Sequence, residues 1–300
     1  MSGLPDPTFT WVRAVLGRGT RVLAIDPLPG ASHTNHRVSA ETMSGARLDL
    51  LLRRFTDFER LTSDPWYSPV DELAAIRALA EVDLPVPRLV AEDARADACD
   101  VPTLLLTWLD GETPEAPADL EAFARGLAEP LPAIHAAEAP PGMRVYEPYF
   151  ASDGIAAEDL RPPAWAVEPR TWERAFEVVA AAPPQAPMRF IHRDYHHGNT
   201  VWRDGRLTGI VDWTTGCLGP PGIDLAQARI NLAWDHDQGT ADAFLRAWRA
   251  LGADAGAEHP YWDLLDAIDW LGDGTADPDD DVEALRRYES FVARALAELG

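Results

Sequence analysis

A carboxylate, a carboxamide and a second carboxylate occur at a spacing that suits phosphoryl transfer. Residues 189–213 read RFIHRDYHHGNTVWRDGRLTGIVDW, in which Asp194 is followed by Asn199 and, thirteen residues later, by Asp212. In this chemistry a carboxylate accepts the proton of an attacking hydroxyl, and hard oxygen ligands hold Mg²⁺ on the phosphates of a nucleotide. We therefore expect Asp194 to be the catalytic base, and Asn199 and Asp212 to be metal ligands.

The pattern HRDYHHGN followed by VDW resembles the catalytic loop and metal-binding strand of the aminoglycoside phosphotransferase and choline kinase families, relatives of the protein kinases. The resemblance implies an α+β, two-lobed protein-kinase-like fold. Its N-terminal lobe would be a small antiparallel β-sheet with one helix, and its larger C-terminal lobe would be mainly helical. It also implies ATP or GTP with Mg²⁺, and a small-molecule hydroxyl as the phosphate acceptor.

Further residues of this region receive supporting roles from the same resemblance. His192 is expected to brace the loop, and His196, in the family pattern HxDxHxxN, to hydrogen-bond the backbone near the metal ligands. A metal-ligand role for His196 or His197 is the weaker alternative, because Mg²⁺ prefers oxygen donors. Asp224, in GPPGIDLA, is expected to cap the following helix and support the catalytic loop.

The predicted grip on the nucleotide phosphates depends on arginine. All 26 basic residues are arginine, and Arg53 ends an apolar run where the related kinases place a lysine. Arginine presents a planar, permanently charged fork that matches phosphate. Glu72 is the expected partner of this cation, with Asp71 as its competitor. Arg54 alternates to the other face of the strand and is expected to have no such role, while the alternative for Arg53 is a surface position.

Two further segments complete the predicted nucleotide site. The turn-rich stretch 29–36 is expected to cover the phosphates, with Ser32 and Thr34 as hydrogen-bond donors, although a plain surface hairpin explains it equally well. The adenine is expected at the backbone of Thr107, Trp108 and Leu109, where a strand leads into a proline-rich linker. Trp108 either flanks the base or packs in the core.

The surrounding elements divide the chain at the same linker. Residues 9–26 hold a helix-like stretch and an apolar run, strands are expected at 38–40, 48–53, 89–92 and 102–108, and a helix at 71–80. Helices follow at 120–137, 171–181, 224–235, 240–251, 260–271 and 282–299, with a hairpin at 200–212. We expect a nucleotide-binding lobe at 1–107 and a catalytic and substrate-binding lobe at 108–300. The acidic stretch 273–281 is expected to be a solvated loop, and the C-terminal tryptophans to be core or acceptor-site walls.

Composition limits the kinds of molecule that the protein is expected to bind. The net charge of −23 argues against nucleic acid, and it suits a cationic acceptor as well as it suits mere solubility. No apolar run approaches the roughly 20 residues needed to cross a membrane. We see no secretory signal, CxxC or Cys/His cluster, and therefore expect a cytoplasmic protein without disulfides or structural zinc. The sequence predicts no oligomeric state.

The acceptor stays open at this stage. An aminoglycoside or other antibiotic is one interpretation, and an amino alcohol, hydroxy-amino acid or sugar derivative of metabolism is another. A catalytically weak nucleotide-binding protein is a third, since the arginine at position 53 and the single glycine of the 29–36 loop depart from the kinase pattern.

Overall fold

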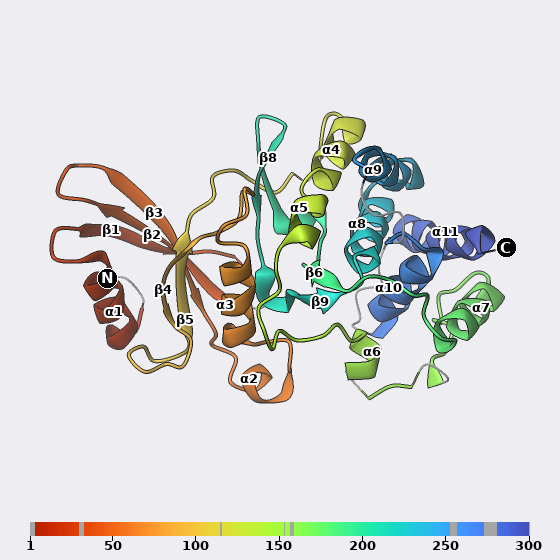
Figure 1. The fold of residues 1–300 in the computed structure, drawn as a ribbon, viewed down its shortest axis with the longest axis horizontal. Coiled ribbons are helices and arrows are strands. Elements are labelled where there is room, and N and C mark those ends of the chain that lie inside the picture. The colour runs from red at the N-terminus through yellow and green to blue at the C-terminus, as the bar shows by residue number, and fades with distance from the viewer. Residues whose placement is uncertain are drawn as a thin grey trace. The chain divides into compact units, whose positions relative to one another are not determined.

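The chain forms two compact units in a computed structural model that describes residues 4–29, 33–114, 116–152, 154–156, 159–252, 257–272 and 281–299 (Figure 1). The first unit comprises Met1–Gly111 and Thr208–Thr215, and the second comprises Glu112–Leu207 and Gly216–Gly300. Residues 208–215 belong to the first unit because they bind its loops: the amide of Ile210 donates to the carbonyl of Pro85 at 2.8 Å. The division of roles at residue 107 stays a prediction.

The first unit is built on a five-stranded antiparallel sheet of order β1-β2-β3-β5-β4. Its strands are β1 (Arg21–Pro27), β2 (Thr34–Glu41), β3 (Arg47–Arg54), β4 (Leu89–Asp93) and β5 (Thr103–Thr107). Alternate apolar residues of neighbouring strands share a face, so Val38, Leu50 and Leu52 are buried together. Helix α1 (Asp6–Leu16) contributes Val12 to this core.

Helix α3 (Pro69–Ala78) begins two residues before the predicted start. The side chain of Ser68 caps it by accepting the amide of Asp71, and Pro69 at the first helical position needs no hydrogen-bond partner for its nitrogen. The short α2 (Arg60–Ser63) precedes it. The first unit therefore contains α1 and α2 besides the one helix that the fold class required.

The predicted 29–36 loop is shorter than expected. Residues 30–32 lie outside the described residues, and Thr34, Asn35 and His36 belong to β2, where they pair with Arg54, Arg53 and Leu52. Backbone pairing with β3 outweighs the local turn tendency of this polar segment.

The second unit is mainly helical. Its helices are α4 (Leu120–Ala128), α5 (Leu131–Ala136), α6 (Tyr149–Ser152), α7 (Pro169–Ala180), α8 (Gly222–Asp235), α9 (Gln238–Ala250), α10 (Pro260–Gly272) and α11 (Val282–Glu298). The single helix predicted for 120–137 is wrong: it is interrupted before α5 because Pro130 and Pro132 lack the amide hydrogens that a continuous helix requires. Of the acidic stretch 273–281, residues 273–280 lie outside the described residues.

Short strands hold the predicted catalytic segment. Strands β6 (Arg189–Ile191) and β9 (Cys217–Gly219) pair antiparallel. Strands β7 (Thr200–Arg203) and β8 (Arg206–Ile210) form the predicted hairpin around the Asp204-Gly205 turn. The 3₁₀ turn η2 (His197–Asn199) forms the end of the first predicted motif, and η3 (Trp213–Thr215) begins at the last residue of the second.

The C-terminal tryptophans are mainly core residues. Helix α8 packs against α9, α10 and α11, and the rings of Trp172, Trp234 and Trp270 lie 5.1–5.9 Å from the ring of Tyr288. Of the two predicted roles, the structure favours core packing for this group.

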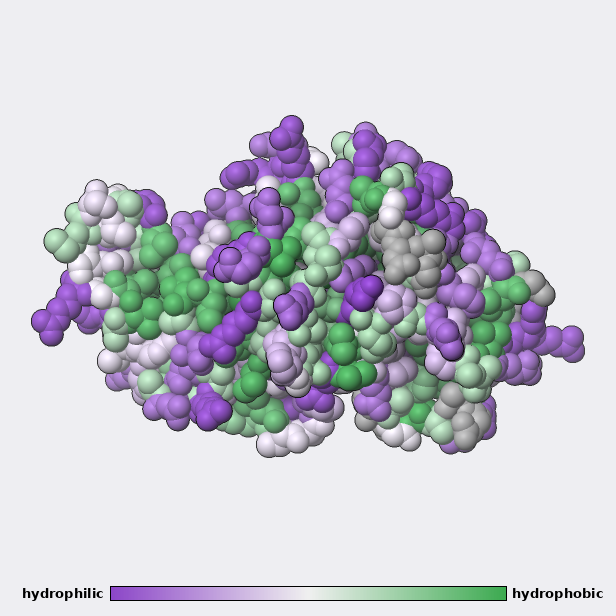
Figure 2. All heavy atoms as spheres, in the orientation of Figure 1, coloured by the Kyte–Doolittle hydropathy of each residue, from purple (hydrophilic) through white to green (hydrophobic). Residues whose placement is uncertain are grey.

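The surface is polar and mixed. In the view of Figure 2, hydrophilic residues are spread over the face and hydrophobic residues form small patches between them. Within the described residues, no helix combines the length and apolar composition that crossing a membrane requires.

Candidate active site

The carboxylate of Asp194 is held by two amide groups of the second unit. The Nδ2 of Asn199 donates to its Oδ2 at 2.8 Å and to the Asp194 carbonyl at 3.0 Å, while Nε2 of Gln227 donates to its Oδ1 at 2.9 Å. The Asp194 side chain is 35% exposed. Two donors that approach different oxygens fix the orientation of this carboxylate while leaving it open to another molecule.

A second, fully buried carboxylate holds the backbone that precedes Asp194. Asp224 accepts the amides of His192 at 3.0 Å and Arg193 at 2.8 Å, and Nε2 of His135 donates to it at 2.9 Å. The prediction that Asp224 supports the catalytic loop is confirmed by these bonds. The prediction that it caps α8 is wrong, because it lies in the first turn and no side chain caps that helix.

The sequence motifs did not indicate the contact of Gln227 with Asp194. It follows Asp224 by three residues on α8, so both side chains lie on the same face of the helix and reach the same loop. The spacing from Asp224 is the only sequence signal that could have indicated it.

The loop is also anchored before and after Asp194. Arg193 has a left-handed backbone (φ 70°), its guanidinium lies 3.8 Å from the ring centre of Tyr149, and its Nη2 donates to the carbonyl of Glu147 at 2.8 Å. The buried hydroxyl of Tyr195 donates to the carbonyl of Leu127 at 2.7 Å. A non-glycine residue with positive φ costs about 1–3 kcal/mol, which these contacts must offset.

The two histidines that follow make contacts within the second unit, and Nε2 of His196 lies 3.6 Å from Oδ1 of Asp194. His196 accepts the amide of Gly198 at 3.1 Å through Nδ1, which confirms the expected backbone contact. A Cβ at Gly198 would lie 2.5 Å from Cε1 of the same ring, so a larger residue there would force the His196 ring to shift. His197 is buried and its Nε2 lies 2.9 Å from a carboxylate oxygen of Asp235.

In the first unit, Arg53 connects the two predicted acidic residues. Its Nη1 donates to Glu72 Oε1 at 2.6 Å, to Asp212 Oδ1 at 2.9 Å and to the Thr214 hydroxyl at 3.3 Å. Asp212 has a left-handed backbone (φ 62°) at the end of β8. One nitrogen makes all three bonds, so the guanidinium takes a position that a lysine ammonium could also occupy.

This cluster shifts the ionisation of its members. Burial disfavours the charge of Arg53, but Glu72 and Asp212 together raise its pKa above the ordinary value. Burial also raises the pKa of Glu72, to about 7, against the opposing effect of Arg53. The pKa of Asp212 shifts in the opposite direction from that of Glu72: burial opposes its ionisation, but Arg53 holds the pKa well below the usual range. Asp212 is therefore a permanent anion at neutral pH.

Arg54, expected to have no role and to serve as a comparison for Arg53, has a structural partner of its own. It is buried, and its Nη2 donates to Asp100 Oδ2 at 2.6 Å. Its replacement would leave Asp100 without this partner, so Arg54 is not a neutral comparison for Arg53. The exposed Arg47 at the start of β3 is the better control.

The predicted phosphate-covering residues are only partly described. Ser32 lies outside the described residues. The hydroxyl of Thr34 lies 2.7 Å from that of Thr56, within the first unit. His33, which belongs to the predicted 29–36 stretch, packs against Phe55 and Tyr67 with ring centres at 4.7 and 4.9 Å. Its burial, and after that the charge of Arg53, lower its pKa to about 3.

Two of the three predicted hinge amides are already engaged. The amide of Thr107 donates to Arg88 at 2.9 Å, and that of Trp108 donates to Asp49 at 3.3 Å. The ring of Trp108 lies 4.7 Å from the guanidinium carbon of Arg37. Within the part of the chain that the structure describes, the Leu109 amide makes no hydrogen bond.

The donor set fits Mg²⁺. Both bonds to Asp212 fall on Oδ1, which leaves Oδ2, and Asn199 uses its nitrogen, which leaves its amide oxygen. Among the described residues no group of three or more His, Cys, Asp or Glu side chains could hold a metal ion. Mg²⁺ is commonly bound by one or two protein oxygens together with substrate phosphates, and each of these two oxygens is a donor of the kind that it prefers.

Comparison with known proteins gives one sequence relative over part of the chain. A homoserine kinase from Rhodospirillum rubrum is 31% identical over 165 residues. The alignment covers 51% of this chain and 50% of that protein, so it spans about half of its length.

Solved structures match over nearly the whole chain. Macrolide 2'-phosphotransferase MphH from Brachybacterium faecium is 18% identical with a TM-score of 0.61, covering 97% of this chain and 98% of that one. The streptomycin–ATP complex of APH(2")-IIa is 14% identical with a TM-score of 0.60, covering 97% and 96%. At these identities the likeness concerns the fold, and it confirms the expected α+β, protein-kinase-like architecture.

A family model decides the membership. The model of the phosphotransferase enzyme family, APH, matches residues 25–262, which is most of the chain and includes both predicted motifs. The chain therefore belongs to the phosphotransferase enzyme family.

Proposed function

We propose that this protein is a small-molecule kinase that transfers the γ-phosphate of ATP or GTP to a hydroxyl group. The observation that carries the proposal is the Asp194 carboxylate, which Asn199 and Gln227 orient. The amide oxygen of the same Asn199 is able to bind a metal. Phosphoryl transfer depends mainly on positioning and electrostatics, and a fixed, accessible carboxylate supplies the first of these.

The proposed role of Asp194 is to accept the proton of the acceptor hydroxyl. Its backbone is fixed through the two amides that Asp224 binds, so the position of the carboxylate does not depend on the acceptor. An oriented base lowers the entropy that the acceptor must lose to reach a reactive geometry.

Asn199 and Asp212 are the residues that would hold Mg²⁺, which when bound neutralises negative charge on the phosphates. The lowered pKa of Asp212 supports this assignment, because the ligand is already deprotonated at neutral pH. Arg53 is proposed to bind the phosphates, and the Leu109 amide to bind the base. We propose residues 1–107 as the lobe that supplies most of these nucleotide contacts.

Two acceptor classes are supported by the relatives. The 31% identical homoserine kinase favours a hydroxy-amino acid or a related amino alcohol. The fold shared with macrolide and aminoglycoside phosphotransferases favours a hydroxylated antibiotic. The net charge of −23 suits a cationic member of either class.

The experiment is a panel of acceptors scored by ADP or GDP release with Mg²⁺. It includes L-homoserine, amino alcohols, sugars, aminoglycosides and macrolides, each with the wild type and with Asp194→Ala. We expect one class to be phosphorylated by the wild type, and Asp194→Ala to abolish turnover while nucleotide affinity, measured by calorimetry, is retained. Near-native turnover by Asp194→Ala would refute the assigned base. Nucleotide binding without turnover on any acceptor would favour a nucleotide-binding protein that is not a kinase.

A further inference from the structure

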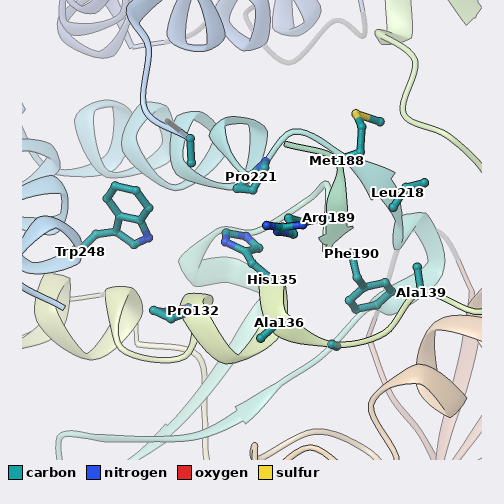
Figure 3. Close-up of a pocket in the computed structure, with 12 residues that line it drawn as sticks. Pro132, His135, Ala136, Ala139, Met188, Arg189, Phe190, Leu218, Pro221 and Trp248 are labelled. Atoms are coloured by element: carbon teal, nitrogen blue, oxygen red, sulfur yellow. The ribbon is translucent and has the colours of Figure 1, made fainter. Parts of the chain in front are cut away.

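A cavity of about 490 Å³ lies within the second unit and includes none of the predicted site residues (Figure 3). Helix α5 contributes His135, β6 contributes Arg189 and Phe190, β9 contributes Leu218, and α9 contributes Trp248. The cavity is large enough for a small organic molecule. Its walls combine apolar side chains with a few polar groups, as ligand sites commonly do.

One of these polar groups is a buried donor without an acceptor. The Trp248 side chain is almost fully buried, and its Nε1 has no hydrogen-bond partner in the described part of the chain. Figure 3 shows the indole nitrogen on the side of the ring that faces His135. Most buried indole N–H groups have a partner, so an unsatisfied one that lines a cavity indicates a position for an external acceptor.

The second polar group is a cation without a counterion. Arg189 is exposed at the start of β6, and it makes no ion pair with any described residue. In a chain of net charge −23, none of the twelve residues that line the cavity is Asp or Glu. The lining therefore offers positive charge and hydrogen-bond donors, and this combination favours an anionic ligand over a cationic one.

We propose that this cavity binds a small organic anion with an apolar body. Its carboxylate or phosphate accepts hydrogen bonds from the Arg189 guanidinium and the Trp248 indole, while its apolar part packs against Phe190 and Leu218. Arginine recognises both kinds of anion through the same planar fork, so the shared feature is the charged oxygen group.

Hydrogen bonds connect the cavity to the predicted catalytic loop. His135 lines the cavity and bonds to Asp224 at 2.9 Å, and Asp224 binds the amides of His192 and Arg193. A ligand that restrains His135 therefore restrains this loop. Any effect on phosphoryl transfer rests on the proposed function, whereas the binding site itself does not.

The test uses benzoate and phenyl phosphate as probes, with benzylamine as a cation that carries the same ring. Calorimetry with the full chain is expected to show that both anions bind more tightly than benzylamine. Arg189→Gln and Trp248→Phe each weaken anion binding by about tenfold or more, because each removes a hydrogen bond to a charged group. The comparison of benzoate with phenyl phosphate shows which anion the site prefers.

The matched control is Arg170→Gln, which neutralises another exposed arginine of the second unit outside the cavity. Equal loss of binding in Arg170→Gln and Arg189→Gln, equal affinity for benzylamine, or no binding of either anion would overturn the site. Arg189 is exposed, so its replacement keeps the test valid even if Trp248→Phe folds poorly. Asp194→Ala is expected to bind the probes as the wild type does, which separates this site from the proposed active site.

Hydrogen exchange tests the connection to the loop. Saturating benzoate or phenyl phosphate is expected to slow amide exchange at residues 191–194 in the wild type and not in Arg189→Gln. Binding with unchanged exchange there would overturn the connection.

Discussion

Asp224→Asn is expected to destabilise the second unit, although it changes a single atom of a residue outside the HRDxxxxN motif. The two carboxylate oxygens of Asp224 are used unequally. Oδ2 accepts from the His192 amide at 3.0 Å and lies 2.9 Å from His135 Nε2, while Oδ1 accepts from the Arg193 amide at 2.8 Å. All of these groups are buried, so water cannot replace a lost acceptor.

The magnitude follows from this geometry. An asparagine can place its remaining oxygen where Oδ2 lies, and so retain two of the three donors as neutral hydrogen bonds. Its NH₂ group then faces the Arg193 amide, and two donors meet without an acceptor. Loss of one buried charge-assisted bond and weakening of two others gives about 2–4 kcal/mol. This is a large part of a typical free energy of unfolding of about 5–15 kcal/mol.

Urea unfolding at neutral pH, followed by far-UV circular dichroism, measures this cost. The matched control is Asp235→Asn on the same helix, where the half-exposed carboxylate has one histidine contact and the expected loss is below about 1 kcal/mol. A loss for Asp224→Asn no greater than that of the control would refute the argument that this buried carboxylate holds the loop.

Substitutions at three other positions, Arg53, Gln227 and Asp93, test the remaining clusters. Because one nitrogen of Arg53 makes all its cluster bonds, Arg53→Lys should keep the affinity for Mg-nucleotide within about fivefold of the wild type. Arg53→Met should lower this affinity at least about tenfold, and the exposed Arg47→Met is the control. Equal losses in Arg53→Met and Arg47→Met would contradict the assignment of Arg53. Gln227→Leu removes a donor to Asp194 and should lower kcat about tenfold or more with nucleotide affinity unchanged; unchanged kcat in steady-state assays would dismiss the positioning role. Burial opposes ionisation of Asp93, but three backbone amides lower its pKa below the ordinary value. The ionised Asp93 therefore stabilises the folded state fully above about pH 4, and this contribution is lost as pH falls through the folded-state pKa. Asp93→Asn should therefore cost about 1–3 kcal/mol at pH 7, and the gap from wild type in urea unfolding should narrow below about pH 3; a constant gap would exclude this origin.

Local patterns in the sequence were sufficient for most elements. Short apolar runs indicated β3 and β5, and apolar residues at helical spacing indicated α8 to α11, because both patterns mark residues that the fold buries. The errors fall where a local tendency meets a partner elsewhere. Thr34 has a polar, turn-like neighbourhood, but pairing with Arg54 places it in a strand.

The burial of Arg54 is a second feature that the local sequence pattern did not predict. Strand alternation predicted that it faces away from Arg53, and this says nothing about what lies on the other face. Asp100 lies there, 46 residues along the chain, and the local pattern gave no indication of its partly buried ion pair with Arg54.

The sequence alone determined the chemical groups of this protein: a carboxylate, a carboxamide and a second carboxylate at kinase-like spacing, with arginine as the only permanent cation. Their spacing is local, so no tertiary structure was needed to recognise them. Only the fold decided what holds them. Gln227 orients Asp194 from 33 residues away, and His135 reaches Asp224 across 89 residues. Hydrogen bonds of this kind depend on which helix faces the fold brings together, and the local sequence pattern does not show which residues become neighbours.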